Sequence, residues 1–254
     1  MSIATRTENR VAYIEIARPE KKNALTGAMY GALADAIEAA EADTDVRAMV
    51  LHGSRAIFTA GNDIQDFQAA GGERTGEPPS RRFMRALTGA TKPVIAAVNG
   101  PAIGIGTTLL LHCDLVYLGE DAQLKMPFVS LGLCPEFGSS LVLPALAGHA
   151  RAAEKLMLGD AIAPQEAVDM GIATRVLPAD EVLDFARQQG ERFAALPPEA
   201  VRTTKRLMRG PRHEAIWAQI LVEFNDFGER LKSGEAQEAF AAFMERRKPD
   251  FSRF

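Results

Sequence analysis

The stretch that decides the fold is Lys92-Pro93-Val94-Ile95-Ala96-Ala97-Val98-Asn99-Gly100-Pro101-Ala102-Ile103-Gly104-Ile105-Gly106. Its first part is an apolar run rich in β-branched residues, which is typical of a buried strand, and the run breaks at Asn99-Gly100-Pro101. After Gly106 a second apolar run, 107–113, is typical of a buried helix. Glycines where a helix begins let backbone N–H groups approach a ligand, and the helix dipole favours negative charge there. The stretch therefore predicts a strand, a glycine turn and a helix whose N-terminus faces a binding site.

A single carboxylate stands downstream, in Leu131-Gly132-Leu133-Cys134-Pro135-Glu136-Phe137-Gly138. Its neighbours are apolar residues and glycines, so the stretch suggests one isolated base beside a donor site for a developing oxyanion. Apolar surroundings would raise the pKa of Glu136, whereas a helix beginning after Pro135 would lower it. The sequence leaves open which of the two effects is larger.

The rest of the chain alternates strands and helices as far as about residue 180. Strands are expected at 11–17, 48–51, 92–98, 115–118 and 171–177, and helices at 26–42, 81–88, 144–158 and 164–170. Thr26 is expected to cap the first of these helices, and 70–80 is expected to be a loop. Beyond 180 the pattern is helical, with breaks at Leu196-Pro197-Pro198, Gly210-Pro211 and Ser233-Gly234. The pattern predicts an α/β fold with a helical C-terminal segment.

Composition narrows the possible partners. The 254-residue chain has a net charge of −4, which gives no basic field for nucleic acid or an anionic membrane, and no apolar run reaches the length of a membrane span. The two cysteines and four scattered histidines show no metal-ligand spacing. We therefore expect no nucleic-acid partner, no membrane association, no metal and a reducing, cytoplasmic location.

Several motifs resemble one enzyme family in the order in which that family carries them. Besides the central stretch, they are Arg18-Pro19, Asn23-Ala24-Leu25, Phe58-Thr59-Ala60-Gly61-Asn62-Asp63, Cys113-Asp114-Leu115-Val116-Tyr117 and Arg247-Lys248-Pro249. They resemble the enoyl-CoA hydratase/isomerase (crotonase) superfamily over nearly the whole chain. The resemblance implies an α/β crotonase (ClpP-like) spiral of ββα units, with residues 1–195 forming the core and the acyl-CoA site. Residues 196–254 would form a C-terminal helical region that serves oligomerisation and covers the CoA site.

The same resemblance implies the chemistry. Family members bind an acyl-CoA thioester, stabilise its enolate, assemble as homotrimers or homohexamers and need no cofactor, since coenzyme A is part of the substrate. Hydratase-type members carry two glutamates, which would fall at Thr108 and Phe128 and are absent here. The stretch around Glu136 instead resembles that of the peroxisomal-type Δ3,Δ2-enoyl-CoA isomerases, which carry a single glutamate at the position of Glu136. One base can remove a proton from C2 and return it to C4, and no water is needed.

The resemblance also assigns individual site residues. Catalytic roles fall to Glu136 as proton shuttle and to the backbone N–H groups of Ala60 and Ile105 as oxyanion donors. The substrate- and CoA-binding set is Arg18, Lys21, Ala24, Ala60, Gly61, Asp63, Ile64, Gly104, Phe128 and Leu133. Gly61 and Gly104 are expected to keep the donor turns open, and Phe128 and Leu133 to keep water away.

Each assignment has a plainer alternative. The loop that holds Arg18 and Lys21 could simply be solvated, Asp63 is expected to act mainly as a helix cap, and His112 is expected to be a packing residue. Two other activities stay open, namely a hydratase that uses Glu136 with water, and an acyl-CoA-binding module of this fold without turnover. A dinucleotide site is disfavoured because no complete Gly-x-Gly-x-x-Gly follows the strand.

Overall fold

The computed structural model describes residues 2–63, 66 and 76–254. Its main sheet has the strand order β1-β2-β3-β4-β6-β8, in which β1 runs antiparallel to β2 and the other neighbours are parallel. The strands are β1 (Ile3–Glu8), β2 (Val11–Ile16), β3 (Ala48–His52), β4 (Val94–Val98), β6 (Leu115–Gly119) and β8 (Arg175–Leu177). The α/β class expected from the sequence is confirmed, with a helical C-terminal segment from Val182 onward.

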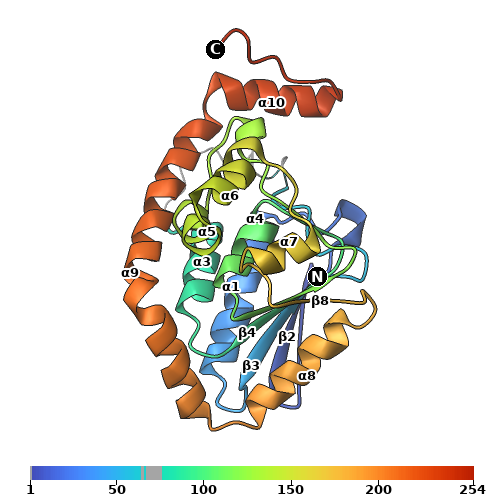
Figure 1. Ribbon diagram of the computed structural model, residues 1–254, viewed down its shortest axis with the longest axis vertical. Coiled ribbons are helices and arrows are strands. Elements are labelled where there is room, and N and C mark those ends of the chain that lie inside the picture. Colours follow the sequence, from blue (N-terminus) through green and yellow to red (C-terminus); the bar gives the residue numbers. More distant parts are fainter. Residues whose placement is uncertain (1, 64–65, 67–75) are drawn as a thin grey trace.

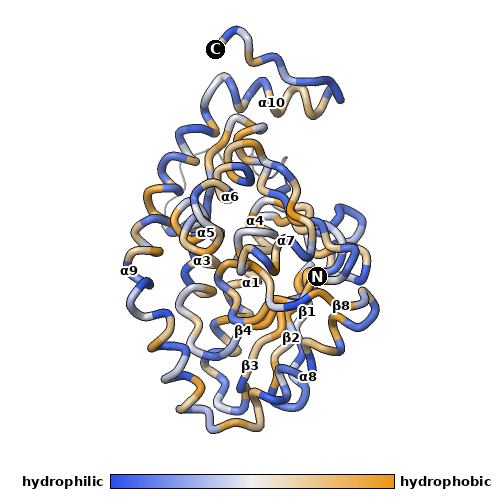
Figure 2. The backbone as a smooth tube through the Cα atoms, viewed as in Figure 1, coloured by the Kyte–Doolittle hydropathy of each residue, from blue (hydrophilic) through white to orange (hydrophobic). Residues whose placement is uncertain are grey.

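Helices cover both faces of this sheet (Figure 1). On one face α1 (Gly27–Ala42) and α3 (Pro79–Gly89) pack over Met49 and Leu51 in the main core. On the other face α8 (Val182–Ala194) covers Val50. Successive strand residues point to opposite faces, so a sheet covered on both sides needs apolar residues throughout its strands. Figure 2 shows this as mostly orange colour along the strands at the centre of the molecule.

A small second sheet stands beside the first and builds the site. It pairs β5 (Pro101–Ile103) with β7 (Gln123–Lys125) in parallel. Isolated bridges join Thr59 to Ala102 and Leu25 to Asn62, also in parallel. The motif that contains Ala60 is thereby placed next to the glycine turn that follows β4. The sequence did not predict β5 and β7, because three-residue strands are too short to show a period.

The remaining helices follow the sheet in the chain. They are α4 (Ile105–Thr108), α5 (Ser139–Ala147), α6 (His149–Ala153), α7 (Pro164–Asp169), α9 (Pro198–Leu231) and α10 (Gly234–Glu245). Short 3-10 turns are η1 (Pro19–Lys21), η2 (Leu109–His112) and η3 (Val129–Leu131), and η4 (Glu154–Leu158) is a π-helical turn. Among the described residues no helix combines the length and the apolarity that a bilayer crossing requires.

Several expected boundaries are confirmed. Thr26 caps α1, since its hydroxyl oxygen accepts from the Met29 N–H at 3.3 Å. The breaks at Leu196-Pro197-Pro198 and Ser233-Gly234 also occur, because α9 begins at Pro198 and α10 at Gly234. The proposed division at residue 195 falls in the turn between α8 and α9, and the two-part organisation itself stays a prediction.

Other boundaries are wrong for local reasons. The break expected at Gly210-Pro211 is absent, and α9 continues through Pro211. The helix expected at 144–158 is three short pieces, since Gly148, in an extended positive-φ conformation, separates α5 from α6, and α5 already begins at Ser139. The strand expected at 171–177 shrinks to β8, and 107–113 is divided between α4 and η2. Within the loop expected at 70–80, Pro79 and Ser80 belong to α3, and 70–75 lie outside the described residues.

Contacts far apart in the sequence hold α9 against the core despite its internal proline. Near its start, Lys205 Nζ lies 2.7 Å from an Asp114 carboxylate oxygen, and Arg209 Nη2 lies 3.1 Å from the other oxygen. Farther along, the Glu223 carboxylate accepts from Ser140. α9 is therefore tied at two levels, and it follows the whole length of the molecule in Figure 1.

Candidate active site

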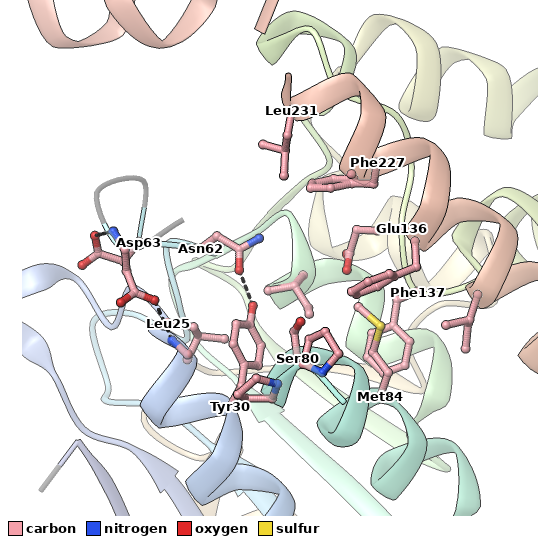
Figure 3. A pocket seen from close by; sticks show the side chains of 18 residues that line it. Leu25, Tyr30, Asn62, Asp63, Ser80, Met84, Glu136, Phe137, Phe227 and Leu231 are labelled. Atoms are coloured by element: carbon pink, nitrogen blue, oxygen red, sulfur yellow. Dashed lines mark hydrogen bonds between the residues drawn. The ribbon is translucent and has the colours of Figure 1, made fainter. Parts of the chain in front are cut away.

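A cavity of about 330 Å³ opens between α1, α3, α9 and the turn that contains Glu136 (Figure 3). One side is polar, with Tyr30, Asn62 and Ser80, and the other is apolar and aromatic. The lining residues of the apolar side are Met84, Ile105, Phe137, Ile220, Phe224, Phe227 and Leu231. In Figure 3 Asn62 and Glu136 approach the cavity from opposite sides.

Glu136 is a buried carboxyl in the lining of this cavity. Its side chain is 5% exposed, and burial raises its pKa to about 8. The Thr108 hydroxyl donates to Glu136 Oε1 at 2.5 Å and opposes that rise, while the charge of Glu223 adds to it. A carboxyl with a pKa near neutrality can both take up and release a proton within one reaction.

The helix that was expected to lower this pKa acts on a different carboxylate. α5 begins at Ser139, and its first turn is capped from α9 by Glu223. The Glu223 carboxylate accepts from the Gly138 N–H, from the Ser140 N–H at 2.9 Å and from the Ser140 hydroxyl at 2.5 Å. Burial is the largest cause of the raised pKa at Glu136.

The Ile105 N–H is a free donor next to the same cavity. Ile105 is the first residue of α4 and lines the cavity, and its N–H has no acceptor among the residues that the structure describes. The preceding Gly104 has φ +57, ψ −118 and donates its own N–H to the Lys125 carbonyl at 2.8 Å. Gly104 thus shapes the turn as expected, since residues with a side chain rarely adopt this conformation.

The Ala60 N–H, unlike that of Ile105, already has a backbone acceptor within the described ranges. It donates to the Lys22 carbonyl at 3.0 Å, so a thioester oxygen would have to take this donor over from Lys22. The next residue, Gly61, has φ +87, and a Cβ there would lie 2.8 Å from the Ile103 carbonyl oxygen. Gly61 is therefore required by the close approach of two backbones. The oxyanion role of Ala60 stays a prediction.

The candidate CoA contacts at the N-terminal loop are partly occupied by structural bonds. Arg18 Nη1 donates to Asp63 at 2.7 Å and to the Ala24 carbonyl at 2.9 Å. Asp63 Oδ1 in turn accepts from the Asp66 N–H at 3.3 Å. The capping role expected of Asp63 stays a prediction, since 64, 65 and 67–75 lie outside the described residues. Lys21 is exposed. Phosphate binding by Arg18 or Lys21 stays a prediction.

The apolar residues of the predicted set lie behind the cavity wall. Phe128 and Leu133 are 4% and 7% exposed and belong to the main core. The Phe128 ring meets the Phe227 ring edge to face, with centroids 6.3 Å apart, and so supports a residue that does line the cavity. Ile64 lies outside the described residues.

Sequence reasoning missed three groups of this site. The Tyr30 hydroxyl donates to Asn62 Oδ1, which orients the Asn62 amide along the polar wall (Figure 3). The sequence identified Thr108 only as a position where hydratases of the family carry a glutamate. The structure shows that its hydroxyl donates to the Glu136 carboxylate. Glu223 had no signal in the sequence, because only the fold brings α9 to the start of α5.

No metal site emerges from the described part of the chain, where no three His, Cys, Asp or Glu side chains gather as ligands would. The arrangement offers a buried carboxyl of raised pKa and a backbone donor, whose residues both line one cavity. Such a site can move a proton next to a polarised carbonyl group.

Comparison with known proteins agrees with this chemistry. The family model described as enoyl-CoA hydratase/isomerase matches residues 6–253. The chain is 31% identical to the Escherichia coli 2,3-dehydroadipyl-CoA hydratase, with 96% of each chain covered. It is 33% identical to the Rattus norvegicus enoyl-CoA delta isomerase 2, covering 96% of this chain and 64% of the rat protein. A solved enoyl-CoA hydratase/isomerase from Pseudoalteromonas atlantica superposes with a TM-score of 0.94 at 41% identity, covering 99% of this chain and 100% of the other.

Proposed function

This chain belongs to the enoyl-CoA hydratase/isomerase family, whose members act on acyl-CoA thioesters, and from that premise we propose that it shifts a double bond from C3 to C2 of an enoyl-CoA. The observation that carries the proposal is the buried carboxyl of Glu136, with its pKa raised to about 8, in the lining of a cavity that has one polar and one apolar side. Two other carboxylates line the cavity, but both accept hydrogen bonds that stabilise their charged form. Asp63 accepts from Arg18, and Asp66 accepts from the Gly27 N–H.

In the proposed reaction the ionised Glu136 carboxylate removes a proton from C2. The electron pair of the broken C–H bond enters the thioester carbonyl and gives an enolate. The thioester carbonyl then re-forms from the enolate, and the electron pair between C1 and C2 makes the new double bond between C2 and C3. The electron pair of the old C3–C4 double bond takes the proton from Glu136 at C4, which regenerates the carboxylate. No atom is gained or lost, so one group with a pKa near neutrality can complete the cycle.

The enolate oxygen needs donors that are in place before charge develops on it. The Ile105 N–H is unpaired within the described residues and lies at the positive end of a short helix, in the wall that also holds Glu136. Loss of one such donor typically costs about 3–4 kcal/mol of transition-state stabilisation. The Ala60 N–H is proposed as the second donor, once the oxygen displaces the Lys22 carbonyl.

A second candidate function is hydration of a 2-enoyl-CoA, which is favoured by the hydratase name of the E. coli relative. Adding water requires one group to orient the water and another to handle the α-proton. Where hydratases of the family would carry two glutamates, this chain has Thr108 and Phe128. Thr108 is bonded to Glu136 and Phe128 is buried, which favours the isomerase.

The deciding experiment offers the purified protein a 3-enoyl-CoA and, separately, a 2-enoyl-CoA. Conversion of the first to the 2-trans product without hydration of the second supports the proposal. Efficient hydration of the second would replace the isomerase assignment by the hydratase one. Tight CoA-ester binding with neither reaction would favour a binding module.

The donor assignment has its own test at Ile105. Ile105→Pro deletes the N–H and should abolish turnover, whereas Ile105→Gly keeps the N–H and should retain most of it. Equal activity of the two variants would place the oxyanion site elsewhere.

Assembly, location and cofactor use complete the proposal. We expect a homotrimer or homohexamer in the cytoplasm, acting without metal or redox cofactor, with coenzyme A entering as part of the substrate. Sedimentation analysis would measure the assembly state directly.

A further inference from the structure

The backbone immediately after Glu136 is held in an uncommon conformation. Phe137 has φ +61 and Gly138 has φ +72, so two consecutive residues occupy the left-handed region. Glycine adopts this region readily, but phenylalanine does so only when its surroundings enforce it. Because the direction of the Glu136 side chain depends on this turn, whatever enforces the turn also aims the carboxyl.

His112 supplies the contacts that Phe137 needs. His112 Nε2 lies 2.6 Å from the Phe137 carbonyl oxygen, and a carbonyl can only accept, so Nε2 carries the proton and donates. The two rings also stack, with centroids 4.3 Å apart and planes inclined by 27°. Both residues are buried, at 3% and 1% exposure. One side chain thus holds both the carbonyl and the ring of Phe137.

The position of His112 in the chain connects it to the rest of the site. Thr108 and His112 are four residues apart on the continuous α4–η2 segment, and they bond to the consecutive residues Glu136 and Phe137. The same segment begins with Ile105, the proposed oxyanion donor. The Arg209 guanidinium in turn donates to the His112 carbonyl at 2.6 Å and fixes the segment from α9.

We propose that His112 is a positioning residue, which aims Glu136 at the cavity by clamping the left-handed Phe137 turn. This role rests on the proposed function of Glu136 and explains a buried imidazole that the reaction itself does not use. His112 stays neutral as it acts, because burial lowers its pKa to about 4.

Two substitutions separate the hydrogen bond from the ring. His112→Phe keeps a stacking ring and removes the donor, whereas His112→Gln keeps a donor and removes the ring. We expect His112→Phe to lower kcat about 10–100-fold with KM within about twofold of wild type, as misplacement of a reacting group does. His112→Gln should recover part of that loss.

His52→Phe is the matched control. His52 is equally buried, at 4% exposure, but it lies at the end of β3, and its Nδ1 contacts the neighbouring Gly53 carbonyl. We expect it to leave kcat near wild type. Equal losses of kcat in the His52 and His112 variants would indicate general destabilisation and would overturn the proposal.

A measurement without substrate separates this proposal from the proposed function. In protein labelled with ¹³C at glutamate carboxyls, the Glu136 resonance is identified by its absence in Glu136→Gln, and its titration midpoint is followed with pH. We expect the midpoint to rise in His112→Phe, because a displaced carboxyl loses the Thr108 hydrogen bond that stabilises its charged form. An unchanged midpoint with unchanged kcat overturns the positioning role. Absence of isomerase activity in the wild type would instead overturn the proposed function and leave the titration as the test of the clamp.

Discussion

Glu136 and Glu223 are two buried carboxylates at one turn, and they differ in what surrounds them. Glu223 accepts from two backbone N–H groups and one hydroxyl, whereas Glu136 accepts from the Thr108 hydroxyl and faces a cavity. Burial raises the pKa of both groups. The three donors around Glu223 oppose the rise there, as expected of a carboxylate that caps a helix.

The difference separates a structural carboxylate from a reactive one. The three donors around Glu223 favour its charged form and hold α9 to the start of α5. Glu136 has one hydrogen-bond donor and lines the cavity, and with a pKa of about 8 its protonated and ionised forms are both populated near neutral pH. Substitutions at the two positions should therefore fail in different ways.

The largest expected difference is in activity. Glu136→Gln should lower isomerase turnover by about 10²–10⁴-fold, because the amide cannot accept the C2 proton, while acyl-CoA binding is retained. Glu223→Gln serves as the matched control, since it also neutralises a buried carboxylate of raised pKa. Steady-state kinetics with a 3-enoyl-CoA and a binding titration measure both. Similar losses of turnover in the two variants would contradict the separation.

The second difference is the pH dependence of stability. The unfolded chain ionises Glu136 near its usual pKa of 4.5, but the folded protein does so only near 8. The unfolded state therefore binds fewer protons between these values, and the contribution of Glu136 to stability falls as pH rises through them. Glu136→Gln removes this loss, so the variant should gain on the wild type between pH 5 and pH 8, by on the order of a few kcal/mol.

Urea denaturation of both proteins at the two pH values measures this gain. The amide introduced by the substitution can still accept from the Thr108 hydroxyl, so the local hydrogen bond is preserved in the comparison. A difference in unfolding free energy that does not change with pH would mean that Glu136 ionises normally in the folded protein.

The third prediction concerns the structural carboxylate. Glu223→Gln replaces a charged acceptor of three hydrogen bonds by a neutral one, and should lower the free energy of unfolding by about 2 kcal/mol at pH 7. Because the charge of Glu223 raises the pKa of Glu136, the pH–rate midpoint should also move slightly downward. Thermal denaturation and a pH–rate profile test the two effects. An upward shift of the midpoint would be inconsistent with this electrostatic contribution.

The smallest effect is expected at the hydroxyl that donates to Glu136. The activity of the wild type should rise with pH through about 8, since only the ionised carboxylate accepts the C2 proton. Thr108→Val removes the hydrogen bond that stabilises this form, so the midpoint should move to higher pH and activity at pH 7 should fall by up to about tenfold.

Thr107→Val is the control for this shift. Thr107 is also buried, but its hydroxyl donates to the Ala102 carbonyl and does not contact Glu136. Its pH–rate midpoint should match that of wild type. A midpoint in Thr108→Val that coincides with that of Thr107→Val would remove the hydroxyl from the control of the pKa.

The contrast between the two glutamates also shows where sequence reasoning ends. The central strand, the glycine turns at Gly61 and Gly104 and the isolation of Glu136 are local features, and the sequence predicted them. The short pairings of β5 and β7 and the cap that Glu223 provides depend on contacts between distant segments. The occupied N–H of Ala60 depends on such a contact as well. For the same reason His112 was expected only to pack, because nothing near it in the sequence reveals the Phe137 carbonyl.

The long helix α9 carries Glu223 next to Phe224 and within about one turn of Phe227, both of which line the cavity. An acyl group too bulky for the cavity would push against α9, the helix whose Glu223 holds the backbone after Glu136 in place. An acyl-CoA ester of this kind would still bind through its coenzyme A portion, but it would displace the Glu136 carboxyl from the carbon atoms on which it acts. Discrimination by chain size should accordingly appear as slow conversion of well-bound esters, so that kcat falls with acyl bulk before KM rises.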